Sequence, residues 1–243
     1  WGRDLLRGRN LNAPVGGVRP NPELANDVAL VPDASSSSQS VSLMYSLVRM
    51  DWKRTFVHLN YTWSRNRTDT TGAFAIPANG DNLDTEWGPG PGDVPHRVGG
   101  SFSMQPIRNM TLGLNVRAAS GSPYNVTTGR DDNGDGLFTD RPAGTSRNSA
   151  RGEMQIDLGG RLSYAWGFGK PRQAAGGAGG TAVMISVGGG GGGLAPGFGG
   201  GAEDKRYRLE VYISGQNLLN RVNFSAYSFV LTSPFYGDPV AAA

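Results

Sequence analysis

Apolar and polar residues alternate along six stretches of the chain. In residues 55–64, for example, Leu59, Tyr61 and Trp63 fall at every second position and polar residues stand between them. Successive side chains of a β-strand point to opposite faces, so a period of two indicates a strand with one apolar face. The alternating stretches are residues 39–48, 55–64, 97–104, 109–119, 154–166 and 205–216. Because no stretch keeps the three-four spacing of a helix over several turns, the pattern predicts an all-β protein.

The predicted strands are long, mostly about 10 to 13 residues. A strand of a soluble protein typically has about five or six residues, whereas a strand that crosses a bilayer needs about 9 to 11. One face carries Leu, Val, Ile and Met, with Tyr or Trp near the strand ends. The other face carries Arg, Asp, Asn, Ser, Thr, Gln and Gly, which suits a hydrated lumen. We therefore expect an antiparallel transmembrane β-barrel segment, with Leu112 facing lipid and Thr111 facing the lumen. An extended soluble sheet is the alternative.

Short and long connections alternate between these strands. The sequences "RMDWKR" and "QPIRN" predict short inner turns, whereas residues 66–96 and 120–153 predict long outer loops. This asymmetry is typical of outer-membrane barrels. We expect residues 1–38 to form an outer loop or the connection from a preceding strand, and residues 39–243 to form the barrel portion. Residues 167–204 break the pattern as a glycine-rich, low-complexity insertion, within which "TAVMISV" is a candidate short strand.

Composition narrows the function. Of 23 basic residues 20 are arginine, but they are scattered among 20 acidic residues and the net charge is only +3, which argues against a nucleic-acid partner. The chain has no cysteine and no apolar run long enough for a transmembrane helix. Two histidines, His58 and His96, are too few for a zinc site, and no nucleophile elbow is present. The carboxylates Asp81, Asp84 and Glu86 fall in a polar loop. We expect no enzymatic activity.

One loop motif suggests a metal. Asp131, Asn133, Asp135 and Gly136 occupy the first, third, fifth and sixth positions of a calcium-binding loop. Leu137 would offer its carbonyl oxygen at the seventh position. The twelfth position, where a bidentate Glu is usual, is proline, and Asp140 would replace it in part. Ca²⁺ is thus the one candidate cofactor, and a solvated turn of Asx and glycine residues is the alternative.

Several segments resemble a known family. They are "NYTWSRNRTD", "NLDTEWGPGPGDVPHRVGGSFS", "LGLNVRAASGSPYNVTTGRDDNGDGLFTDRPAGTSRNSARG" and "EVYISGQNLLNRVNFSAYSFVLTSPFYGDP". They resemble the C-terminal barrel region of TonB-dependent outer-membrane receptors, in particular the Oar-like group with a carboxypeptidase-regulatory-like domain. The resemblance runs from about Ser38 onward. The glycine-rich insertion departs from the family's pattern.

The resemblance implies a barrel of twenty-two strands closed by a plug. Six strands cannot close such a barrel, so we expect an incomplete fragment, roughly the last third, without plug, TonB box or final strand. It implies location in the bacterial outer membrane and energised uptake of a scarce nutrient. The implied partners are outer-membrane lipid, the TonB energy-coupling protein and an unidentified ligand. The alternatives are a surface adhesion or assembly protein on the same barrel, and a soluble calcium-stabilised β-module.

Overall fold

The computed structural model describes residues 1–14, 18–80, 82–171 and 205–242. Within these ranges the protein is all-β, and the single helical element is a short 3₁₀ turn. The elements are β1 (Gly2–Asn10), β2 (Val28–Arg49), β3 (Thr55–Thr68), η1 (Leu83–Glu86), β4 (Gly88–Pro89), β5 (His96–Met104), β6 (Met110–Ala119), β7 (Pro123–Tyr124), β8 (Ala150–Arg151), β9 (Gln155–Pro171), β10 (Lys205–Gly215), β11 (Phe224–Tyr227) and β12 (Pro239–Ala242). No described helix is long and apolar enough to cross a membrane.

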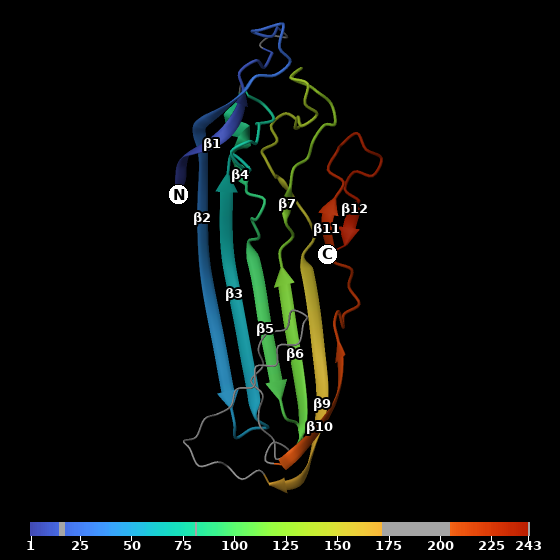
Figure 1. Cartoon of the computed structure of the whole chain (residues 1–243). Coiled ribbons are helices and arrows are strands. Elements are labelled where there is room, and N and C mark those ends of the chain that lie inside the picture. Colours follow the sequence, from blue (N-terminus) through green and yellow to red (C-terminus); the bar gives the residue numbers. More distant parts are fainter. Residues whose placement is uncertain (15–17, 81, 172–204, 243) are drawn as a thin grey trace.

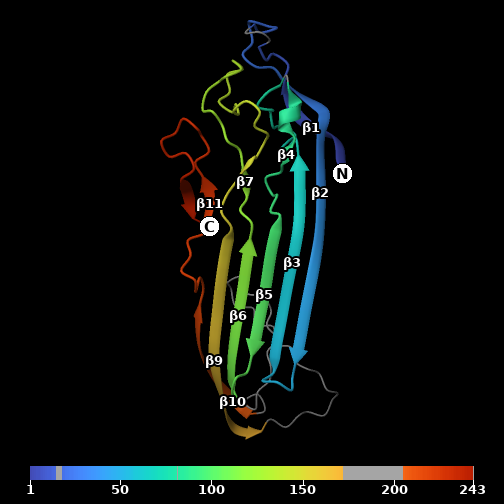
Figure 2. The same ribbon diagram turned by 180° about the vertical axis from the view of Figure 1, so that it is seen from behind.

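The long strands form one antiparallel sheet. Its order is β1-β2-β3-β5-β6-β9-β10, with β4 paired to β3, and two small sheets, β7-β8 and β11-β12, lie apart from it. Figure 1 shows the long strands side by side in a single layer, with the long connections at one end and the short turns at the other. The reverse view shows no second layer of described residues behind the sheet (Figure 2). No pairing joins β1 to β10 among the described residues, so the sheet is open.

The register joins the alternating patterns of neighbouring strands into two uniform faces. Apolar residues pair with apolar residues across the sheet, and three of their rows are Leu43–Tyr61–Val98–Ala118–Ile156, Tyr45–Leu59–Gly100–Val116–Leu158 and Leu47–Val57–Phe102–Leu114–Gly160. Along β10 the same face continues through Leu209, Val211 and Ile213. A slip of one residue in any strand would break these rows, so the alternation itself specifies the register.

The apolar face of the sheet is open. Ile213 is 72% exposed, Leu43 65% and Leu59 45%, although each lies within a paired strand. Among the described residues, the buried hydrophobic side chains are small: Ala34, Ala78, Val94, Val126 and Ala165. The largest fully buried side chains are instead polar, namely Arg7, Glu86 and Ser103. The described chain therefore has no apolar core beneath its sheet.

The six predicted strands are confirmed, but the first of them, predicted from residue 39, begins earlier. Residues 2–10 form β1, and β2 already begins at Val28. Residues 28–38 contain a run of serines without alternation, which hid the strand. Its backbone nevertheless pairs on both sides: Ser36 lies opposite Gly2 in β1 and opposite Thr68 in β3.

The glycine-rich insertion begins later than predicted, because residues 167–171 belong to β9. Pairing with β10 extends the strand: Tyr207 lies opposite Phe168, and their rings stack with centroids 5.6 Å apart. The segment "TAVMISV" lies outside the described residues. In the C-terminal tail, residues 224–227 and 239–242 pair as β11 and β12.

Candidate functional site

Polar side chains gather on the face of the sheet opposite the apolar rows. Two adjacent rows run Met44–Asn60–Gly99–Arg117–Asp157 and Ser42–Thr62–Arg97–Ala119–Gln155. The glycine in the first row matters, because a Cβ atom on Gly99 would lie 2.4 Å from the Asn60 side-chain oxygen. Gly99 thus leaves room for the Asn60 carboxamide, and the sheet is hollowed at this point.

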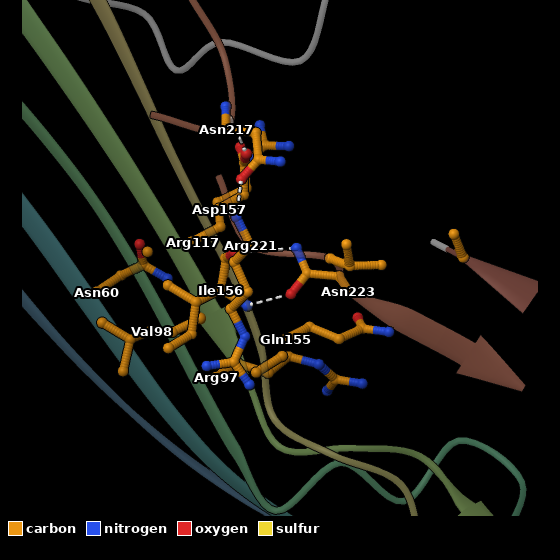
Figure 3. A pocket seen from close by; sticks show the side chains of 15 residues that line it. Asn60, Arg97, Val98, Arg117, Gln155, Ile156, Asp157, Asn217, Arg221 and Asn223 are labelled. Atoms are coloured by element: carbon orange, nitrogen blue, oxygen red, sulfur yellow. Dashed lines mark hydrogen bonds between the residues drawn. The ribbon is translucent and has the colours of Figure 1, made fainter. Parts of the chain in front are cut away.

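The resulting hollow has a volume of about 800 Å³. Its polar lining includes Asn60, Arg97, Arg117, Gln155, Asp157 and Arg221, and we call it the polar hollow. Figure 3 shows that these side chains come from β3, β5, β6 and β9 and from the segment that follows β10. The volume is in the range of small-molecule binding sites.

The segment after β10 forms one wall of the polar hollow. Asn217 and Asn220 have φ values of 50° and 49°, a left-handed conformation that asparagine tolerates better than most residues. A turn closed by the Asn220 N–H and the Asn217 carbonyl, 2.9 Å apart, keeps the chain beside β9. The Asn223 side chain then accepts a hydrogen bond from the Ile156 N–H and donates one to the Ile156 carbonyl, each 2.9 Å long. This carboxamide takes the place of a strand neighbour, so the wall is held by specific contacts.

Positive charge predominates in the polar hollow. Arg97, Arg117 and Arg221 line it together with a single carboxylate, Asp157. Asp157 lies opposite Arg117 in the register and accepts a hydrogen bond from the Asn217 N–H at 3.2 Å. Arg221 donates to the Met154 carbonyl at 2.9 Å, with Glu153 3.9 Å away. The Arg97 side chain is exposed and makes no hydrogen bond or ion pair with any described residue.

The structure brings the predicted calcium-loop residues together, but their side chains bind the loop's own backbone. The Asp131 carboxylate accepts from the N–H groups of Asp135 (3.0 Å) and Gly136 (2.9 Å). The Asp135 side chain accepts from the Leu137 N–H at 2.7 Å, while Asn133 accepts from Asp135. These contacts are those of nested Asx turns.

Asp140 closes this loop from its far side. Its carboxylate accepts from the N–H of Asp132 at 2.7 Å and of Asn133 at 3.3 Å. Burial raises the pKa of Asp140, the two backbone hydrogen bonds oppose this rise, and the charges of Asp135 and Asp131 add to it. In the described part of the chain, no three His, Cys, Asp or Glu side chains are grouped as a metal site requires. Calcium binding therefore stays a prediction of the sequence.

The long loops form a cap over one end of the sheet, and two ion pairs join them, one of them fully buried. We call residues 69–95 and 120–154 the loop cap; Asp81 lies outside the described residues. Glu86 from the first loop pairs with Arg141 from the second, at 1% and 4% side-chain exposure. Asp93, at 6% side-chain exposure, pairs with Arg151, at 32%, over a distance of 2.6 Å. Alternation carries no information about such contacts, so they could not be predicted from the sequence.

Arg147 is the third charged residue at the centre of the loop cap. It is 7% exposed, and its Nη1 atom has no hydrogen-bond partner among the described residues. Burial lowers the pKa of Arg147, and the nearby charge of Glu86 opposes that effect. Glu86 thus compensates two arginines, and its charge is central to the order of the cap.

The two histidines lie on different faces of the sheet. His58 is on the polar face, with its Nδ1 atom 2.9 Å from the Ser46 hydroxyl. His96 is on the apolar face, with its Nδ1 atom 2.8 Å from the Tyr61 hydroxyl. In the comparisons with known proteins, no protein-family model, curated protein or solved structure matched the chain.

Proposed function

We propose that this chain forms part of the wall of a bacterial outer-membrane β-barrel, of the type found in TonB-dependent receptors that take up a scarce nutrient. The observation that carries the proposal is the uninterrupted apolar face on β2, β3, β5, β6, β9 and β10, with polar rows on the opposite face. An exposed apolar surface of this extent needs a cover. A bilayer covers such a face while leaving the other face in water.

The height of the apolar face fits a bilayer. Along β9 the apolar positions run from Ile156 to Phe168, about twelve residues, or about 40 Å of strand at about 3.3 Å per residue. A tilt of about 35–45° reduces this to about 29–33 Å, close to the thickness of a hydrocarbon core. Aromatic pairs lie near both ends: Tyr61 with His96 toward the loop cap, and Phe168 with Tyr207 toward the short turns.

The two ends of the sheet also differ as they do in outer-membrane barrels. Short turns join β2 to β3 and β5 to β6, whereas the connections from β3 to β5 and from β6 to β9 build the loop cap (Figure 1). Ordered loops joined by ion pairs are suited to contact a solute outside the cell. Uptake itself, with lipid, the TonB energy-coupling protein and a nutrient as partners, rests on the sequence resemblance.

Fluorescence quenching by brominated lipid tests the placement in a bilayer. Single-tryptophan variants would retain Trp63, Trp166 or Trp87, with the other tryptophans changed to phenylalanine. We expect lipid brominated along its acyl chains to quench Trp63 and Trp166, which lie on the apolar face. Trp87, in the loop cap, is the matched control and should keep its emission. A chain that stays monodisperse in detergent-free buffer and shows equal emission with and without brominated lipid would contradict the proposal.

A further inference from the structure

The polar hollow has unsatisfied binding capacity. The Arg97 side chain has no hydrogen-bond partner among the described residues, and neither has the half-buried carboxamide of Asn60. Asn60 lies beside Gly99, in the row next to that of Arg97. The register makes Arg97 and Arg117 diagonal neighbours on β5 and β6. Diagonal neighbours on one face have Cβ atoms about 7–8 Å apart, which long side chains can span. Two guanidinium groups can therefore reach a single ligand.

The local charges favour an anion. Three arginines and one carboxylate, that of Asp157, line the hollow. The Asp157 carboxylate already accepts a hydrogen bond from the Asn217 N–H. Glu153, the next nearest acid, is 66% exposed and only approaches Arg221 at 3.9 Å. Like charges this close are unfavourable without a counter-charge. Guanidinium groups bind carboxylates and phosphates through paired hydrogen bonds, and the amides of Asn60 and Gln155 offer further donors to the same oxygens.

We propose that the polar hollow binds a small anionic solute that carries carboxylate or phosphate groups. Arg97 and Arg117 bind its charged groups, and Arg221 approaches from the segment that follows β10. The Asn60 amide donates a hydrogen bond to the same solute. The volume of about 800 Å³ admits a molecule of several carbons rather than a single ion. The site lies on the face opposite the apolar rows, so it is occupied from the water-filled side of the sheet. The inference goes beyond membrane placement and uses no property of the bilayer.

Calorimetric titration of the whole chain in a nonionic detergent tests this site. The probes are citrate and inorganic phosphate, with glucose as a neutral solute of similar size to citrate. We expect citrate to bind saturably, phosphate to bind more weakly, and glucose to give no binding heat. Arg97→Gln removes one charge without disturbing any described contact. It should weaken citrate binding about tenfold, the effect of losing one charge-assisted hydrogen-bonding group.

Arg65→Gln is the matched control. Arg65 is an exposed arginine of the neighbouring strand β3, but it lies on the apolar side, two positions beyond Trp63. We expect this variant to bind citrate as the parent chain does. The inference is overturned if neither anion binds saturably at millimolar concentration, or if Arg65→Gln weakens citrate as much as Arg97→Gln. Bilayer placement is measured by the quenching experiment above, so the two proposals can fail separately.

Discussion

Glu86 shows how a single buried charge helps to hold the loop cap together. Its carboxylate accepts a hydrogen bond from the Ala78 N–H at 3.0 Å and pairs with Arg141, and both charged side chains are almost fully buried. Removal of one partner of a buried ion pair leaves the other charge without compensation. In this cap Arg147 would lose its largest compensating charge as well.

Glu86→Gln should therefore loosen the loop cap. The amide oxygen still accepts from Ala78, but both arginines lose their counter-charge, at a cost of about 3–5 kcal/mol to local stability. Hydrogen exchange should become faster in residues 82–95 and 140–151 while exchange in β5 and β6 is unchanged. Glu153→Gln, at an exposed carboxylate, is the control and should leave the cap unaffected. Unchanged exchange in both variants would show that the buried pair does not stabilise the cap.

Asp140 gives a residue-scale test of the calcium prediction. Its pKa is raised in the folded loop, so its contribution to stability is present at low pH and is lost as pH rises through that raised pKa. At neutral pH without metal, Asp140→Asn should thus slow or leave unchanged the tryptic cleavage after the exposed Arg130. The asparagine oxygen still accepts the two backbone hydrogen bonds.

With calcium, the parent loop should instead be cleaved more slowly than the Asp140→Asn variant. If the loop binds Ca²⁺ with the affinity of extracellular sites, about 0.1–1 mM, a few millimolar Ca²⁺ protects the parent loop from trypsin but not the Asp140→Asn variant. Asp132→Asn is the control, because Asp132 is exposed and outside the predicted ligand set. Identical cleavage of the parent chain with Ca²⁺ and with chelator would show the calcium prediction to be wrong.

At the scale of the strand, the alternation of apolar and polar residues predicted the strands that have one apolar and one polar face. Strands β3, β5, β6 and β10 differ from their predicted ranges by at most a few residues, because both faces of each are chemically distinct. The beginning of β2 escaped prediction because serines on both faces give no contrast there. The polar hollow escaped it too, since Arg97 and Arg117 come from different strands and only the register places them diagonally. Its wall depends on asparagine-backbone contacts that no periodicity reveals.

The two faces of β6 can be compared directly. Leu112 lies in the apolar row between Met104 and Leu162, whereas Thr111 lies opposite Ser163 on the polar face. Leu112→Arg should impair insertion into vesicles by roughly 2–4 kcal/mol, the cost of arginine facing lipid at the midplane. Thr111→Arg adds the same charge one residue away and should have a much smaller effect. Equal effects in a vesicle-insertion assay would refute the assignment of the faces.

At the scale of the whole molecule, the sequence predicted an all-β antiparallel chain. The structure adds that this chain consists of a sheet and a loop cap. The loop cap and the sheet are stabilised differently: ion pairs and backbone contacts order the cap, whereas paired strands order the sheet. Neither part contains a large buried apolar side chain among the described residues. The described sheet is therefore held by backbone pairing and not by a buried apolar layer.

An apolar face that is already open in the folded chain has a consequence for its calorimetry. The heat capacity of unfolding arises mainly from newly exposed apolar surface, and ordinary domains show about 12–15 cal/mol/K per residue. This chain has little such surface left to expose, so scanning calorimetry in nonionic detergent should give a value well below that range. The free energy of unfolding would then vary almost linearly with temperature. It would lack the maximum near room temperature and the cold denaturation of proteins that have a large hydrophobic core.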